Sequence, residues 1–194
     1  MNETSDEKRR RLYNAAIDSL HKLAGSPDDR TAIHKALILL QEQPDDDPPP
    51  ADEIEWEQKI WGQTRCVGSS PFHSEHELRI KAGHVCSMHH HRKRANRFIV
   101  KSGCIRIVRM QGLSLRHTLL ESGECADVPS MVAHQFQVLR DGEMTELYYS
   151  DRGGEISVDD IERDTEGCAI DIEKLQNTIG IVADGRFIQE TNET

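Results

Sequence analysis

The sequence predicts an all-β domain, either a barrel or a sandwich, preceded by a helical hairpin. Short runs rich in Ile, Val, Leu, Phe and Tyr occupy residues 54–165, separated by turn dipeptides that contain glycine. Many short strands at such spacing are typical of sandwiches and barrels. Residues 1–44 instead carry apolar residues at helical spacing. A chain of 194 residues is long enough for one such domain with extensions.

Two helices are expected within residues 1–44. The second begins at Ser26, which can cap it, with Pro27 at the first helical position. The first carries an apolar stripe formed by Leu12, Ala16, Leu20 and Leu23. Because an isolated helix pair is marginally stable in water, this stripe needs a surface to bury against. We therefore expect the hairpin to cover apolar surface of the barrel or of a partner, and the protein to be a homodimer.

The segments on either side of the β domain differ in composition. A linker is expected over residues 45–53, because residues 44–50 consist of four prolines and three aspartates, which cannot form a core. Residues 166–194 form a C-terminal extension. It holds a candidate helix over residues 170–177, a candidate strand over residues 179–182, and a polar end that we expect to be loose.

The β domain itself is expected to span residues 54–165. Its clearest strand candidates are residues 78–81, 98–101, 104–110, 117–120, 134–139 and 145–150. Glycine-containing turn signals separate them, at Gly83, Gly103, Gly112, Gly123 and Gly142. His73 and His76 precede the first of these strands. We expect them in a loop, because a three-residue spacing suits a helix and not a strand.

Charge and composition exclude several classes of function. The chain has 24 basic and 34 acidic residues, a net charge of −10, which disfavours a sequence-independent nucleic-acid binder. The longest apolar run, residues 36–40, is far shorter than the ~20 residues of a membrane span. The acidic start does not resemble a signal peptide. The 5 cysteines form no Cys-x-x-Cys pair, so we expect reduced thiols and a cytoplasmic location.

The histidines carry the clearest chemical signal. On a strand, His89 and His91 lie on one face and His90 on the other. Two imidazoles on one face make half of a site for zinc, iron, nickel or copper. His134 is the natural third ligand, because it opens a strand just after the turn around Pro129.

The spacing of these residues resembles the two sequence motifs of the cupin family. Gly83, His89, His91, Asn96 and Gly103 fall on the fixed positions of the first motif, and Gly123, Pro129, Met131, His134 and Val138 on those of the second. Three of these depart from the family residues, which are Glu at Asn96, Gly at Met131 and Asn at Val138. The resemblance implies a double-stranded β-helix, or jelly-roll, barrel. It also implies a divalent metal (Zn, Fe, Mn, Ni or Co) held by His89, His91 and His134, with Asn96 at the position of the acidic ligand.

Within the cupins, residues 59–167 look like the cupin module of type II mannose-6-phosphate isomerases. The similar stretches are Trp61-Gly62, residues 88–92, Val128-Pro129 and residues 157–163. After the histidine run, the family has Ala-Glu-His, whereas this chain has residues 93–97, Lys-Arg-Ala-Asn-Arg. The resemblance implies a sugar-phosphate isomerase.

Further residues are candidates for chemistry around this centre. Asn96 offers only a neutral carbonyl oxygen, so three neutral imidazoles would leave the full charge of the metal ion available to polarise water or substrate. Arg92, Arg94 and Arg97 are candidate anchors for a phosphate or carboxylate. Glu146 and Tyr148 share one face of the last strand, where either could act as an acid or a base.

Three functions are compatible with this pattern. The first is a metal-dependent enzyme acting on a small polar anion, most simply an isomerase of sugars or sugar phosphates. The second is a three-histidine iron oxygenase, in which open positions on the metal host dioxygen and substrate. The third is a non-catalytic cupin that binds a sugar or another metabolite. In each case the partner is a small molecule, with no nucleic acid and no membrane.

Overall fold

The computed structural model describes residues 54–112, 114–157 and 159–190. The predicted hairpin and linker, residues 1–53, lie outside the described residues, so they stay predictions. The predicted all-β domain is confirmed. In chain order, its strands before the C-terminal extension are β1 (Glu57–Lys59), β2 (Gly62–Ser70), β3 (His73–Ile80), β4 (His84–Val85), β5 (His89–His90), β6 (Ala95–Gln111), β7 (Ser114–Glu121), β8 (Cys125–Val128), β9 (His134–Tyr149) and β10 (Glu162–Arg163).

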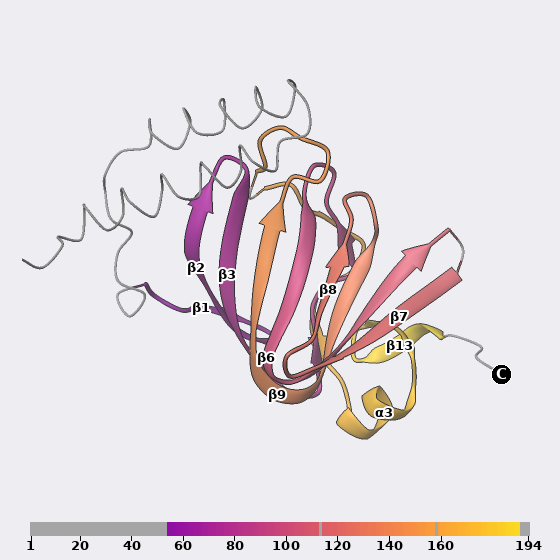
Figure 1. Cartoon of the computed structure of the whole chain (residues 1–194). Helices are drawn as coiled ribbons and strands as arrows, with labels where there is room; N and C mark the ends of the chain where they lie inside the picture. The colour runs from indigo at the N-terminus through magenta and orange to yellow at the C-terminus, as the bar shows by residue number, and fades with distance from the viewer. Residues whose placement is uncertain (1–53, 113, 158, 191–194) are drawn as a thin grey trace, which may run out of the picture. The chain divides into compact units, whose positions relative to one another are not determined.

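The strands form one antiparallel sheet that curls on itself (Figure 1). The two long strands, β6 and β9, pair with each other along most of their length and bend together. On one arm of the curl, β3 pairs with β9 and β2 pairs with β3. On the other arm, β6 pairs with β7, and β4 and β5 pair with β9. The curl encloses the main core, which includes Phe98, Ile105, Ile107, Phe136 and Met144.

The long strands correct the predicted strand ends. Two glycine turns were expected to separate residues 98–101 from 104–110, and residues 134–139 from 145–150. The structure instead carries β6 through Gly103 and β9 through Gly142, with register shifts at the bend. A Cβ atom on Gly142 would lie 2.0 Å from the carbonyl oxygen of Ser102, and one on Gly103, at φ +88°, 2.6 Å from that of Asp141. These glycines permit the paired backbones of β6 and β9 to approach closely where they bend, and they do not end the strands.

β3 corrects a second expectation, because it contains His73 and His76, which were predicted in a loop. The strand pairs with β9, and His76 lies directly opposite Glu146. Ser74, Leu78 and Ile80 are buried, so every second residue faces inward and His76 belongs to the inner set. The charged residues between them ion-pair on the outer face, with Glu77 bonded to Arg65 and Lys101.

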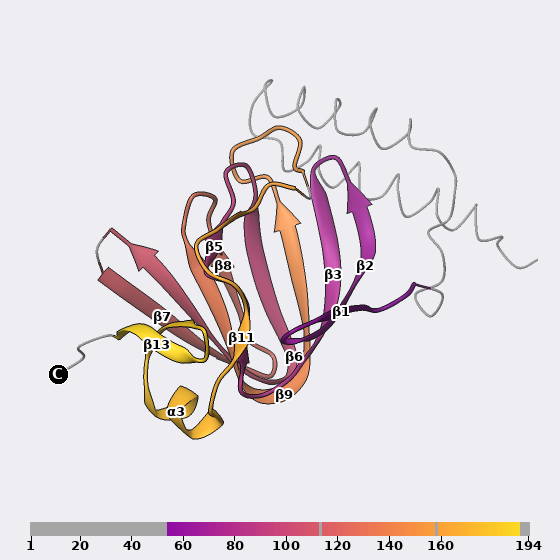
Figure 2. The ribbon, with the colours of Figure 1, turned by 180° about the vertical axis from the view of Figure 1, so that it is seen from behind.

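The C-terminal extension packs on one end of the curled sheet (Figure 2). It consists of β11 (Cys168–Ala169), α3 (Ile172–Asn177), β12 (Gly180–Ala183) and β13 (Arg186–Glu190). Leu175 of α3 packs with Val85, Leu139 and Val182. The buried guanidinium of Arg106 donates to the carbonyl oxygens of Leu175 (2.9 Å) and Thr178 (2.8 Å), which ties the end of the helix to β6. The polar end that we expected to be loose is an ordered strand, β13, as far as residue 190.

In the described residues no helix combines the length and the apolar character that crossing a membrane requires.

Candidate metal centre

The curled sheet brings the three predicted histidines together. His89 on β5 pairs directly with His134 at the start of β9, and His91 follows β5. All three side chains are buried, and their nearest ring nitrogens lie within 4.8 Å of one another. The ring centroids are 4.5–5.6 Å apart. This cluster can hold a divalent metal ion.

Hydrogen bonds orient all three rings in the same way. Nδ1 of His89 donates to the carbonyl oxygen of Ser87 (2.8 Å), and Nδ1 of His134 donates to that of Val132 (2.9 Å). Nδ1 of His91 donates to the carbonyl oxygen of Asp160. With the proton on Nδ1, each Nε2 keeps the lone pair that a metal needs. Nε2 of His91 is buried without a hydrogen-bond partner among the described residues, as expected of a metal ligand.

The contacts of His91 require a choice of tautomer. Nε of Arg94 lies 3.2 Å from His91 Nδ1, and the carbonyl oxygen of Asp160 approaches the same nitrogen more closely. A guanidinium only donates and a carbonyl only accepts, so the two contacts demand opposite protonation of Nδ1. The shorter contact assigns the proton to Nδ1, and the Arg94 approach is then an electrostatic neighbour contact.

Burial keeps the three imidazoles neutral. It lowers the pKa of His89 to about 4 and that of His91 to about 3, and it holds the pKa of His134 well below its usual value. Neighbouring positive charges act in the same direction, including Arg94 for His89 and His91. At neutral pH the site therefore presents three uncharged nitrogen ligands.

Asn96 connects the histidines to Glu146. The fully buried Asn96 donates from Nδ2 to Oε1 of Glu146 (2.7 Å), and the same nitrogen lies 3.3 Å from Nε2 of His134. Its Oδ1 atom has no hydrogen-bond partner among the described residues. Asn96, the predicted fourth ligand, thus lies next to His134 of the histidine cluster and also contacts the carboxyl group of Glu146.

Glu146 and Tyr148 both face the interior from β9. Glu146 is buried and accepts hydrogen bonds from Asn96 and from Tyr148. Burial raises the pKa of Glu146 to about 7, and it raises that of Tyr148 well above its ordinary value. The guanidinium of Arg94 lies 4.1 Å from the centre of the Tyr148 ring, in a cation–π contact.

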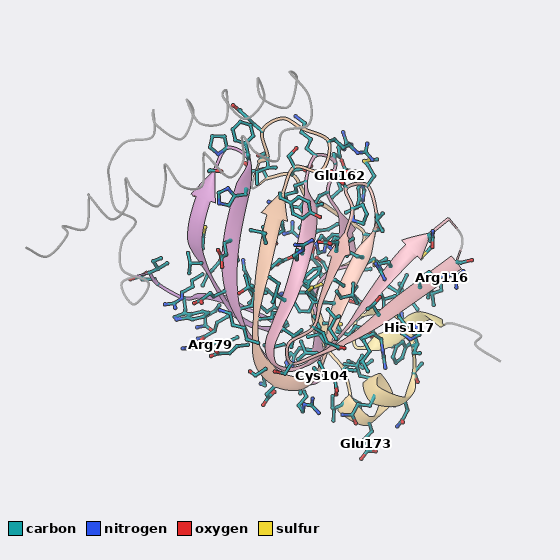
Figure 3. The ribbon with its side chains drawn as sticks, viewed as in Figure 1. Arg79, Cys104, Arg116, His117, Glu162 and Glu173 are labelled. Carbon is teal, nitrogen blue, oxygen red and sulfur yellow. The ribbon has the colours of Figure 1, made fainter. Side chains whose placement is uncertain are left out.

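Part of this group of residues lines a cavity of about 590 Å³, a size typical of small-molecule sites. Its walls include His89, Arg94, Glu146 and Tyr148. Two further walls come from β1 and from residues 161–167, which include β10. In Figure 3, Glu162 of β10 and Glu173 of α3 lie toward opposite ends of the domain.

The three predicted anion-binding arginines lie in different places in the structure. Arg94 is buried in the cavity wall. Arg92 is exposed and pairs with Glu162, outside the cavity lining. Arg97 neighbours Asn96 on β6 and therefore points to the opposite face, where it pairs with Asp127 at 2.8 Å. The structure brings only Arg94 of the three to the candidate site.

Sequence reasoning missed cavity residues on other strands. His76 lines the cavity, and its ring meets that of Tyr148 edge-on at 5.3 Å. The alternation of buried residues along β3 was a readable signal for His76. Trp61 and Arg163 also line the cavity. Arg163 lies opposite His89 in the β5–β10 pair, a register that no sequence pattern specifies.

Comparison with known proteins finds similarity in structure alone. No protein-family model matches the chain, and no curated protein matches it. Oxalate decarboxylase from Bacillus subtilis superposes with a TM-score of 0.50 at 19% identity, over 58% of this chain and 30% of that one. KdgF from Halomonas sp. matches with a TM-score of 0.45 at 19% identity, over 53% of this chain and 94% of its own. The chain spans about a third of the length of the oxalate decarboxylases that it matches.

Proposed function

The chain has the cupin fold, and on this premise we propose that it is a metal-dependent enzyme that isomerises a small anionic sugar derivative, such as a sugar phosphate. One observation carries the proposal. Three buried, neutral imidazoles are oriented for a metal ion, and one of them, His89, lines a cavity together with a buried carboxyl group and a buried arginine. The resemblance of residues 59–167 to type II mannose-6-phosphate isomerases supports the choice of substrate.

Glu146 is the proton-transfer group in this proposal. Isomerisation moves a proton from one carbon to its neighbour, so one base that removes the proton and returns it is sufficient. Asn96 and Tyr148 both donate to the Glu146 carboxyl group, which holds its position in the cavity wall. When bound, the metal ion would polarise the oxygen atoms of the substrate and make the adjacent C–H group more acidic.

Arg94 is the anion-binding group. No carboxylate in the described part of the chain lies within ion-pair distance of its guanidinium, although the side chain is only 5% exposed. A buried guanidinium without a carboxylate partner among the described residues favours an anionic ligand, which it can bind through two parallel hydrogen bonds. Arg163, opposite His89, adds a second positive charge to the same cavity.

Glu146→Gln tests the proposed chemistry. With the natively loaded protein, we expect interconversion of aldose and ketose phosphates, followed by a discontinuous assay of both sugars. The substitution should lower kcat by at least about 100-fold while the metal content stays unchanged, because the three histidines remain. Glu75→Gln on the exposed side of β3 is the matched control and should keep full activity. Wild-type turnover by Glu146→Gln would contradict the assignment.

A second function is favoured by the charge of the ligand set. The histidine cluster contains no carboxylate ligand among the described residues, and a neutral three-histidine site also suits an iron-dependent oxygenase. Oxygen consumption by the Fe²⁺-loaded protein in the presence of substrate would identify that chemistry. Tight binding of sugar phosphates with neither isomerisation nor oxygen consumption would instead identify a non-catalytic binding protein.

A further inference from the structure

β5, the short strand that carries the ligand His89, pairs along one edge with a segment far along the chain. β10 pairs with β5, so that Glu162 faces His90 and Arg163 faces His89. The amide of Asp164 donates to the carbonyl oxygen of Met88 (2.8 Å), and the Met88 amide donates to the hydroxyl group of Thr165 (2.9 Å). Residues 160–165 therefore follow the ligand strand from one end to the other.

Asp160 makes the contacts at the His91 end. Its carbonyl oxygen accepts a hydrogen bond from His91 Nδ1. Its carboxylate accepts from the next two amides, with Oδ1 2.9 Å from the nitrogen of Arg92 and Oδ2 2.7 Å from that of Lys93. One residue thus holds the ring of a ligand and the backbone that immediately follows it.

We propose that Asp160 is a positioning residue of the metal centre. The carboxylate fixes the backbone after His91 relative to the Asp160 carbonyl, and the carbonyl fixes the tautomer and the ring orientation of His91. Hydrogen-bonding partners behind a ligating histidine commonly change metal affinity by 10–100-fold when they are lost. The other two ligands take their carbonyl partners from residues two positions earlier in the chain, Ser87 and Val132. Only His91 depends on a distant segment among the three.

The carboxylate is well suited to this role. Two backbone amides that point at one carboxylate form charge-assisted hydrogen bonds, which are stronger than neutral ones. Partial burial acts to raise the pKa of Asp160, but these two amides and the nearby charge of Arg94 hold it below its usual value. The contacts of Asp160 with His91, Arg92 and Lys93 do not depend on the substrate or on the reaction. Their role can therefore be tested whether or not the proposed isomerisation is correct.

The test compares Asp160→Ala, Asp160→Asn and Asp159→Ala. Asp159 is the exposed neighbour, and its substitution controls for general loosening of the loop. Zn²⁺ and Mn²⁺ affinities are measured by chelator competition, and the tautomer of His91 in the metal-free protein is measured by long-range ¹H–¹⁵N NMR. We expect Asp160→Ala to weaken metal binding by about 10–100-fold and to populate the Nε2-protonated tautomer of His91 alone.

Asp160→Asn keeps one acceptor oxygen and should lose less affinity than Asp160→Ala, whereas Asp159→Ala should match the wild type. If Asp160→Ala does not fold, Asp160→Asn decides the question by the same two measurements. Unchanged metal affinity and an unchanged His91 tautomer in a folded Asp160 variant would overturn the proposal. An equal loss in Asp159→Ala would also overturn it, because the effect would then belong to the loop as a whole.

Discussion

Met131 adopts a backbone conformation that favours glycine. Its φ angle is +69°, and its amide donates to the carbonyl oxygen of His91 at 2.6 Å. The position is the one at which the cupin motif has glycine, and the structure supplies the physical reason. A residue with a side chain in this left-handed region costs about 1–2 kcal/mol of stability. The turn nevertheless forms, because it brings the Met131 amide to the carbonyl oxygen of His91 just before β9 begins.

Met131→Gly should therefore stabilise the protein. Relief of the backbone strain is offset in part by the greater freedom of glycine in the unfolded chain, so we expect a gain of up to about 1 kcal/mol. This corresponds to a rise of about 2–4 °C in Tm, measured by calorimetry. Because the Met131 side chain is 54% exposed, little apolar burial is lost. Met131→Ala keeps the strain and is the control; an equal rise in that variant would contradict the explanation.

Asn96→Glu tests whether position 96 reaches the metal. A carboxylate beside the histidines should tighten metal binding by about 1–3 kcal/mol, with the largest gain for Mn²⁺ because it prefers oxygen ligands. The structure adds a complication, since the new carboxyl group would meet Glu146, which now accepts from Asn96 at 2.7 Å. The double variant with Glu146→Gln removes that repulsion. Equal metal affinities of the wild type, the single variant and the double variant in a chelator titration would place position 96 outside the ligand set.

At the scale of elements, the close approach of β6 and β9 at their bend leads to a specific prediction. Gly142→Ala should destabilise the protein by about 1–3 kcal/mol, because the added Cβ would lie 2.0 Å from Ser102 O and 2.7 Å from Gly103 Cα. Both neighbours are backbone atoms that cannot rotate away. Gly68→Ala on β2, where a Cβ would meet nothing within 4 Å, is the matched control. Urea denaturation measures both, and equal stability of the two variants would contradict the close approach.

The same close approach explains which strand ends were predictable. Alternating apolar residues and turn glycines locate each half of β6 and β9 correctly. A glycine that allows two backbones to approach closely, however, has the same sequence signature as a glycine that ends a strand. The histidine cluster was predictable because parity alone places His89 and His91 on one face. The contacts of Asp160 join residues 68 or 69 positions apart in the chain, and the pairing of Arg163 with His89 depends on sheet register. No local sequence pattern encodes either.

At the scale of the whole molecule, the predicted helical hairpin and homodimer remain to be tested. The apolar stripe of the hairpin needs a surface to cover, so deletion of residues 1–44 should lower solubility or change the mass measured by sedimentation velocity. Substituting Leu12 and Leu20 by Gln is a finer version that leaves the chain length unchanged. A deletion variant with unchanged mass, solubility and Tm would refute the predicted role.

The distance along the chain between His91 and Asp160 has a consequence for biosynthesis. Translation runs from the N-terminus, and the residue that orients His91 is made 69 residues after it. Between the emergence of His134 from the ribosome and that of residues 160–165, the three histidines can meet, but the His91 ring does not yet have the carbonyl oxygen of Asp160 as a hydrogen-bond acceptor. If Asp160 positions His91 as proposed, a metal ion bound in that interval should be held less tightly than in the complete domain, where residues 160–165 pair with β5.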